Sequence, residues 1–134
     1  MTVPPNPPHA DASYQLQIDV NGLKTAGGFT TLVFEPYQNV DQHTIVPGRW
    51  EKWDVDAGQF WSSRSSTEGT CVLVAGAGGP PFYTLAAIKT MCPNAVVVGI
   101  GVNIGSNNPG YTVATDGVQF NPVIYNFEVS KRRH

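Results

Sequence analysis

Hydrophobic and polar residues alternate over several short stretches of the chain, a pattern typical of half-buried β-strands. The clearest example is residues 14–20, in which Tyr14, Leu16, Ile18 and Val20 alternate with polar residues. Turn residues (Gly, Pro, Asn and Asp) separate this stretch from others like it, and those at 56–58 predict a hairpin. Between such turns, further strands are predicted at 30–34, 50–55, 59–63, 70–75, 111–120 and 123–129, of which 70–75 is a short apolar stretch.

Two stretches depart from this alternation. Residues 95–102 are almost continuously apolar, which predicts a strand covered on both faces. In residues 82–91, Phe82, Leu85 and Ile88 recur every third position and Pro93 follows, which predicts one short helix. About eight short strands at regular spacing, with a single helix, predict an all-β fold, and we favour a sandwich over a barrel.

Composition narrows the class of protein. The 134 residues leave room for one domain, and only 13% are charged while 41% are hydrophobic. This balance argues against a disordered chain and against a helical coiled coil. The net charge of −2 gives no basic face for nucleic acid, and no apolar run approaches the ~20 residues of a membrane span. We therefore expect neither nucleic acid nor membrane as a partner.

Both ends differ from the middle of the chain. Residues 1–13 predict an extended arm because they contain four prolines: Pro4, Pro5, Pro7 and Pro8. The predicted domain covers 14–129, and a basic tail at 130–134 contains Lys131, Arg132 and Arg133. The start has neither a positive segment nor an apolar one, so we expect no signal peptide. The chain would then stay in the cytoplasm unless it is exported separately or is cut from a longer secreted protein.

The two cysteines, Cys71 and Cys92, permit one disulfide. It would close a loop of about 20 residues, worth about 3 kcal/mol in the chain-entropy model. The alternative is a reduced protein in which both thiols are small buried hydrophobic groups. Their spacing is not that of a zinc site, and we expect no cofactor.

Catalytic chemistry has weak candidates in this sequence. Of His9, His43 and His134, only His43 could have a rigid seat beside a carboxylate, and an exposed loop position is the simpler interpretation. Glu51, Asp54 and Asp56 are close in sequence, but glycosidase carboxylates face each other, usually from different strands. We therefore expect solvated strand and turn residues here, and no enzyme. A calcium site is the remaining metal option, with ligands drawn from Asp41, Asp54, Asp56 and Asp116.

The aromatic residues carry more information. Three tryptophans fall within a dozen residues, with a tyrosine nearby, and consecutive Phe60 and Trp61 must point to opposite faces of a strand. An exposed indole beside polar groups is a platform for stacking on sugar, whereas buried or interfacial packing explains the same residues equally well. The candidate contacts with a glycan or a partner protein are Trp50, Trp53, Trp61 and Tyr37.

Four motifs in order resemble a set of small secreted and surface β-sandwich domains of actinobacteria. They are WxxWD at 50–54, WSSR at 61–64, GxNxGSxNPG at 101–110 and YxFE at 125–128, and the resemblance spans about residues 14–129. It implies a jelly-roll-like or concanavalin-like sandwich with surface attachment or glycan binding. Asp116 and Glu128 would be structural, accepting backbone hydrogen bonds or pairing with Arg64. The matching residues are Trp50, Trp53, Asp54, Trp61, Ser62, Ser63, Arg64, Asn103, Gly105, Asp116, Tyr125, Phe127 and Glu128.

The arm, the basic tail and the missing leader together favour a virion protein. The first hypothesis is a non-enzymatic decoration protein on the surface of a phage capsid. It would dock on the major capsid protein, or another virion protein, through its termini and one sandwich edge, and self-association would be compatible. The alternative is an extracellular or cell-surface module that binds carbohydrate or cell wall, with a host glycan as its partner. A hydrolase ranks third.

Overall fold

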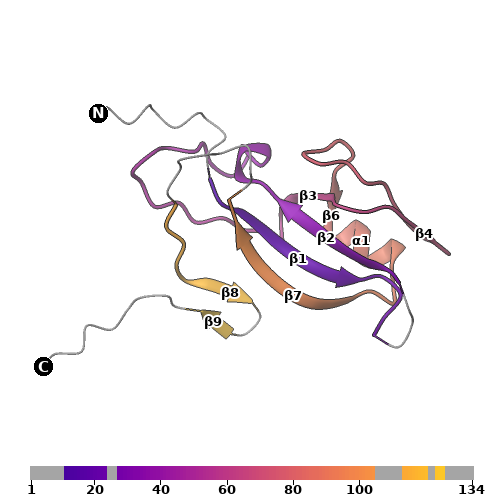
Figure 1. Cartoon of the computed structure of the whole chain (residues 1–134). Coiled ribbons are helices and arrows are strands. Elements are labelled where there is room, and N and C mark those ends of the chain that lie inside the picture. The colour runs from indigo at the N-terminus through magenta and orange to yellow at the C-terminus, as the bar shows by residue number, and fades with distance from the viewer. Residues whose placement is uncertain (1–10, 24–26, 105–112, 121–122, 126–134) are drawn as a thin grey trace, which may run out of the picture.

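A five-stranded antiparallel sheet forms the centre of the computed structural model, which describes residues 11–23, 27–104, 113–120 and 123–125 (Figure 1). The strand order is β6-β3-β2-β1-β7. These strands are β1 (Ser13–Asp19), β2 (Phe29–Phe34), β3 (Gln59–Ser62), β6 (Tyr83–Thr84) and β7 (Val96–Asn103).

Smaller elements lie around this sheet. The hairpin of β4 (Ser66–Glu68) and β5 (Cys71–Leu73) lies at one end, and that of β8 (Val118–Phe120) and β9 (Val123–Tyr125) lies at the other (Figure 1). A short 3-10 helix, η1 (Pro36–Gln38), follows β2, and the helix α1 (Leu85–Met91) follows β6. The protein is thus mostly β with one α-helix among the described residues, which agrees with the predicted all-β class. No helix in the described ranges is long and apolar enough to cross a membrane.

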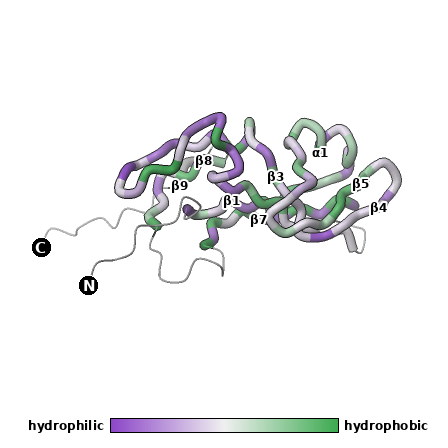
Figure 2. The backbone as a smooth tube through the Cα atoms, turned by 90° about the horizontal axis from the view of Figure 1, so that it is seen from above, coloured by the Kyte–Doolittle hydropathy of each residue, from purple (hydrophilic) through white to green (hydrophobic). Residues whose placement is uncertain are grey.

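The core lies on one face of the sheet. Alternate residues of three strands point to this face, and Leu32, Phe34 and Phe60 are fully buried there. Leu73 of β5 and Ile88 of α1 pack into the same cluster from outside the sheet. The hydropathy-coloured tube shows hydrophobic stretches along the strands, β7 included (Figure 2).

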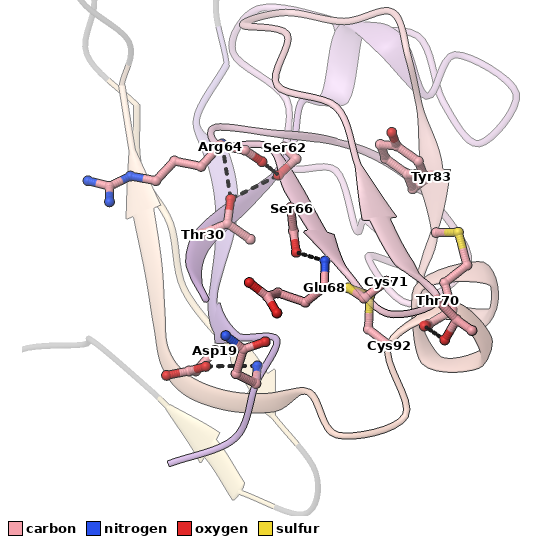
Figure 3. The surroundings of a disulfide bond; sticks show 12 residues. Asp19, Thr30, Ser62, Arg64, Ser66, Glu68, Thr70, Cys71, Tyr83 and Cys92 are labelled. Atoms are coloured by element: carbon pink, nitrogen blue, oxygen red, sulfur yellow. Dashed lines mark hydrogen bonds between the residues drawn. A yellow bond between two sulfur atoms is a disulfide. The ribbon is translucent and has the colours of Figure 1, made fainter. Parts of the chain in front are cut away.

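A disulfide joins Cys71 of β5 to Cys92, which caps the C-terminus of α1 (Figure 3). This confirms the predicted bridge, and both cysteines are buried members of the core cluster. Beside the disulfide, the hydroxyl of Thr30 meets that of Ser62 at 2.8 Å and accepts a hydrogen bond from the backbone N–H of Arg64 (Figure 3). The bridge thus ties β5 to α1, and the hydrogen bonds tie β2 to the end of β3.

The helix begins three residues later than predicted. Tyr83 and Thr84 pair with β3 as β6, so they are extended rather than helical. The side chain of Thr84 then accepts a hydrogen bond from the N–H of Ala87 at 3.1 Å, which caps the first turn of α1.

The prediction that 95–102 is a strand covered on both faces is wrong in its second part. Among the described strands β7 lies at the edge of the sheet and pairs with β1 alone, and Val97, Val98, Ile100 and Val102 are 37–46% exposed. A continuous apolar run does not distinguish a central strand from an edge, because coverage depends on segments far away in sequence.

The other strand predictions differ in extent. The 70–75 stretch forms β5 over three residues, with Ala75 in an isolated bridge to Ser62, and β4 was not predicted because its sequence is polar. β8 is shorter than the predicted 111–120, because residues 113–117 are not in a strand, whereas β9 covers every described residue of the predicted 123–129. Residues 111–112 and 126–129 lie outside the described residues.

Residues 50–55 do not form a strand, so the predicted hairpin with 59–63 is absent as well. Their exposure nevertheless alternates with a period of two, with Trp53 and Val55 packed against the core. The segment is extended along one side of the core without a backbone partner strand. The alternation therefore predicted its burial correctly and its pairing wrongly.

Candidate functional site

A cavity of about 330 Å³ opens at the end of the sheet where β1 begins. Three separate segments build its wall: Asp11 and Tyr14 at the start of β1, the loop 45–53, and residues 113–116 ahead of β8. The disulfide lies at the opposite end of the sheet, beside α1. The cavity therefore depends on contacts between parts of the chain that are distant in sequence.

A side-chain amide holds the irregular segment that carries two of the tryptophans. Gln42 donates from Nε2 to the carbonyl of Asp54 at 2.8 Å, and its Oε1 accepts from the Asp54 N–H at 2.9 Å. The two bonds reproduce the pairing that a neighbouring strand would provide. Asp54, predicted within the strand 50–55, lies instead just ahead of the turn at 55–58, and its side chain also accepts from the N–H of Ala57.

Trp53 is the inward-facing tryptophan of this segment. Its ring meets those of Phe34 and His43 edge-to-face, with centroids 6.1 and 5.3 Å apart. Its indole N–H donates a hydrogen bond to the carboxylate of Asp11. Trp53 is therefore both a core residue and part of the cavity wall.

Trp50 lies at the rim of the cavity and is 69% exposed. It is the most exposed aromatic residue among the described ones. Its side chain is therefore accessible to a molecule that enters the cavity. Of the three tryptophans considered as stacking platforms for sugar, Trp50 is thus the exposed one, whereas Trp53 and Trp61 are partly buried.

Charged side chains complete the wall. Arg49 Nε lies 2.9 Å from Glu51 Oε1, in an ion pair whose carboxylate side is nine-tenths buried. His43 Nδ1 lies 3.9 Å from the other oxygen of Glu51, so the histidine does stand next to a carboxylate, as the sequence allowed. Asp116 also lines the cavity and accepts a hydrogen bond from the N–H of Gly117.

Burial alters the acidity of two groups at this site. Desolvation raises the pKa of Asp11, and the negative charge of Glu51 raises it further, against the hydrogen bonds from Ala12 and Trp53. The pKa of Tyr14 is raised by burial and by the nearby charge of Asp11. The end of the cavity near β1 is thus a partly dehydrated environment that disfavours negative charge.

The other two predicted aromatic contacts lie elsewhere. Trp61 follows the buried Phe60 and points to the opposite face of the sheet, as predicted for consecutive strand residues. Its indole N–H donates to Glu35 at 3.0 Å, and Tyr37 lies near the same carboxylate, whose charge adds to burial in raising the tyrosine pKa. The structure therefore joins Trp50 with Trp53 and Trp61 with Tyr37, in two separate groups.

Several features of the cavity had no clear signal in the sequence. Asp11 falls inside the predicted Pro-rich arm, and Tyr14 and Arg49 carry no motif. Only the structure brings them to the tryptophans. The candidate partner contacts Pro4, Pro5, Pro7, Pro8, Lys131, Arg132 and Arg133 lie outside the described residues.

Metal binding has no candidate within the described ranges, where no group of three or more His, Cys, Asp or Glu side chains could hold an ion. Of the acidic residues considered for calcium, Asp54 and Asp116 use a carboxylate oxygen to accept a backbone hydrogen bond. No family model, curated protein or solved structure matches this chain. Function must therefore be argued from the site itself.

Proposed function

We propose that the protein is an extracellular carbohydrate-binding module, with the cavity beside β1 as its binding site. The observation that carries this proposal is the position of Trp50, 69% exposed at the rim of a cavity of about 330 Å³. Sugar sites combine an aromatic platform with a few fixed polar groups, and Asp11, Arg49 and Glu51 supply such groups here. Their positions are set by Trp53 and by the Arg49–Glu51 ion pair before any ligand arrives.

An extracellular location is supported by the disulfide. Disulfides form and persist in oxidising compartments and are rare in cytosolic proteins. A bridge between two buried cysteines thus favours the secreted or surface alternative over a protein assembled in the cytoplasm. The five-stranded antiparallel sheet also supports the finer proposal of a jelly-roll-like sandwich related to actinobacterial surface domains.

We further propose that the module binds sugar without cleaving it. Glu51 is engaged by Arg49, and Asp11 accepts from the Ala12 N–H at 2.7 Å and from the indole of Trp53. Both carboxylates thereby serve as fixed acceptors that orient a ligand. The capsid-decoration hypothesis stays a prediction, because the termini on which it depended lie outside the described residues.

Co-sedimentation tests the proposal directly. Tag-free protein would be mixed in parallel with purified actinobacterial cell wall and with undecorated phage capsid shells. We expect saturable binding to cell wall that Trp50→Ala weakens by about 10- to 100-fold and Trp50→Phe largely retains, since a stacked ring contributes a few kcal/mol at most.

Lys52→Ala is the matched control, because Lys52 is exposed in the same segment and does not line the cavity. Binding to shells alone would contradict the glycan proposal and support the virion role. Binding to cell wall that Trp50→Ala leaves unchanged would place the glycan site elsewhere on the molecule.

A further inference from the structure

The part of the cavity wall formed by described residues carries more negative than positive groups. Among these residues, the carboxylates of Asp11, Glu51 and Asp116 line it, together with the guanidinium of Arg49. The guanidinium is already engaged with Glu51 at 2.9 Å. Within the described ranges no salt bridge joins Asp11 to a basic side chain, and its contacts are the N–H groups of Ala12 and Trp53.

The ionised form of Asp11 is destabilised by its surroundings in the absence of a ligand. Burial and the nearby charge of Glu51 both raise its pKa, so its ionised form is less stable here than in open solvent. A neutral ligand that displaced water from Asp11 would increase this penalty, because a buried charge needs a charged partner as well as hydrogen bonds. A ligand with a positive charge would instead reduce it.

The aromatic side of the cavity favours the same charge. The face of an indole attracts cations. Trp50 lies exposed at the rim, and Trp53 and Tyr14 form part of the wall. Carboxylate and indole are different kinds of group on different segments. Both groups are complementary to a cation, and the inference of a positively charged ligand rests on the two together.

We propose that the sugar recognised by this cavity carries a protonated amino group, which is held by the carboxylate of Asp11 beside the indole face of Trp50. The inference rests on the proposed function and specifies its ligand: an unacetylated amino sugar rather than a neutral or N-acetylated one. The ammonium group would donate hydrogen bonds to Asp11, and the sugar ring would stack on Trp50.

Calorimetric titration of the wild-type protein with three oligosaccharides of equal length tests this inference. The probes are β-1,4-linked oligomers of glucosamine, N-acetylglucosamine and glucose. We expect the glucosamine oligomer to bind about 10- to 100-fold more tightly than the other two, as for a hydrogen bond between charged groups. Raising the salt concentration should narrow this difference by screening.

A variant locates the charge recognition. In Asp11→Asn the amide oxygen can still accept from Ala12 and Trp53, so the fold should persist while the preference for glucosamine disappears. Asp56→Asn is the matched control, because Asp56 is an exposed acidic residue that does not line the cavity. Melting curves of both variants would verify that they fold.

The outcomes separate the two proposals. Equal affinity for all three oligomers, or a preference for a neutral one, would overturn the amino-sugar inference and leave the carbohydrate module standing. Binding to none of the oligomers, together with no binding to cell wall, would overturn both. A preference for glucosamine that survives Asp11→Asn would overturn the role given to Asp11.

Discussion

At the scale of single residues, two side chains that line the cavity, Asp11 and Trp50, lie in environments that do not stabilise the folded protein. Asp11 is a carboxylate whose surroundings disfavour its charge, and Trp50 exposes a large apolar surface to solvent. Residues that serve only the fold tend to be buried when apolar and solvated when charged. Asp11 and Trp50 line the same cavity, and their occurrence together is the reason to assign the site there.

Asp11 should make stability depend on pH in a specific direction. Because its pKa is raised in the folded state, the folded protein binds the proton more tightly than the unfolded chain does. The free energy of unfolding of the wild type, relative to Asp11→Asn, should therefore fall as pH rises from below 3.8 through the folded pKa. Urea unfolding of both proteins at several pH values measures this, and a constant difference across that range would contradict it.

Gly58 should tolerate no side chain. It is buried between Phe34 and Asn39, and a Cβ added there would overlap the ring of Phe34, itself fully buried. We expect Gly58→Ala to lower the free energy of unfolding by about 1–3 kcal/mol, as overpacking does. Gly101→Ala is the control, because its added Cβ would lie 4.0 Å from Gln15, an ordinary contact. If chemical denaturation finds the two variants equally stable, the prediction is wrong, and the side chains around Gly58 shift to accommodate the added Cβ.

At the scale of elements, the strands of the sheet were the easiest to predict. The predicted strands 14–20 and 30–34 correspond to β1 and β2, each within a residue or two at its ends. Alternation reports which side chains are buried, and that information is local. It does not report whether a partner strand exists, which is why 50–55 was predicted as a strand and is held by Gln42 instead.

The disulfide between β5 and α1 should contribute strongly to the stability of the folded protein. It joins residues 21 positions apart. Closing such a loop lowers the conformational entropy of the unfolded chain, which stabilises the folded state by about 3 kcal/mol. We expect Cys71→Ala/Cys92→Ala to lower the free energy of unfolding by about that amount. Denaturation of the wild type with and without reductant should reproduce the difference. A thiol count on denatured, unreduced protein that finds two free thiols would contradict the bridge.

At the scale of the whole molecule, the site was less predictable than the fold. The residue type and spacing of the tryptophans identified them as candidates in the sequence. The cavity, however, is also lined by Asp11 and residues 113–116, which are about a hundred positions apart. Nothing local in the sequence connects these segments. The β1–β7 pairing, itself non-local, helps to bring them to the same end of the sheet.

The N-terminal segment should divide sharply into a dispensable and an essential part. Ala12 is 1% exposed, and Ser13, the first residue of β1, donates from its hydroxyl to the carbonyl of Asn103 at 3.1 Å. The last residues of the predicted 1–13 arm thus belong to the folded domain. We expect deletion of 1–10 to leave the melting temperature nearly unchanged and deletion of 1–13 to lower it. Equal melting temperatures for the two truncated proteins would contradict this division.

The position of β1 between β2 and β7 also has a consequence for how the protein is made. β2 follows β1 closely, but β7 is synthesised roughly 80 residues later, which takes about 4–16 s at typical translation rates. During this interval one edge of β1 offers its backbone groups without the partner that will finally cover them. The nascent chain thus carries an open strand edge for most of its synthesis. Chaperones that bind nascent chains would therefore be more important for the folding of this topology than for one in which neighbouring strands are consecutive in sequence.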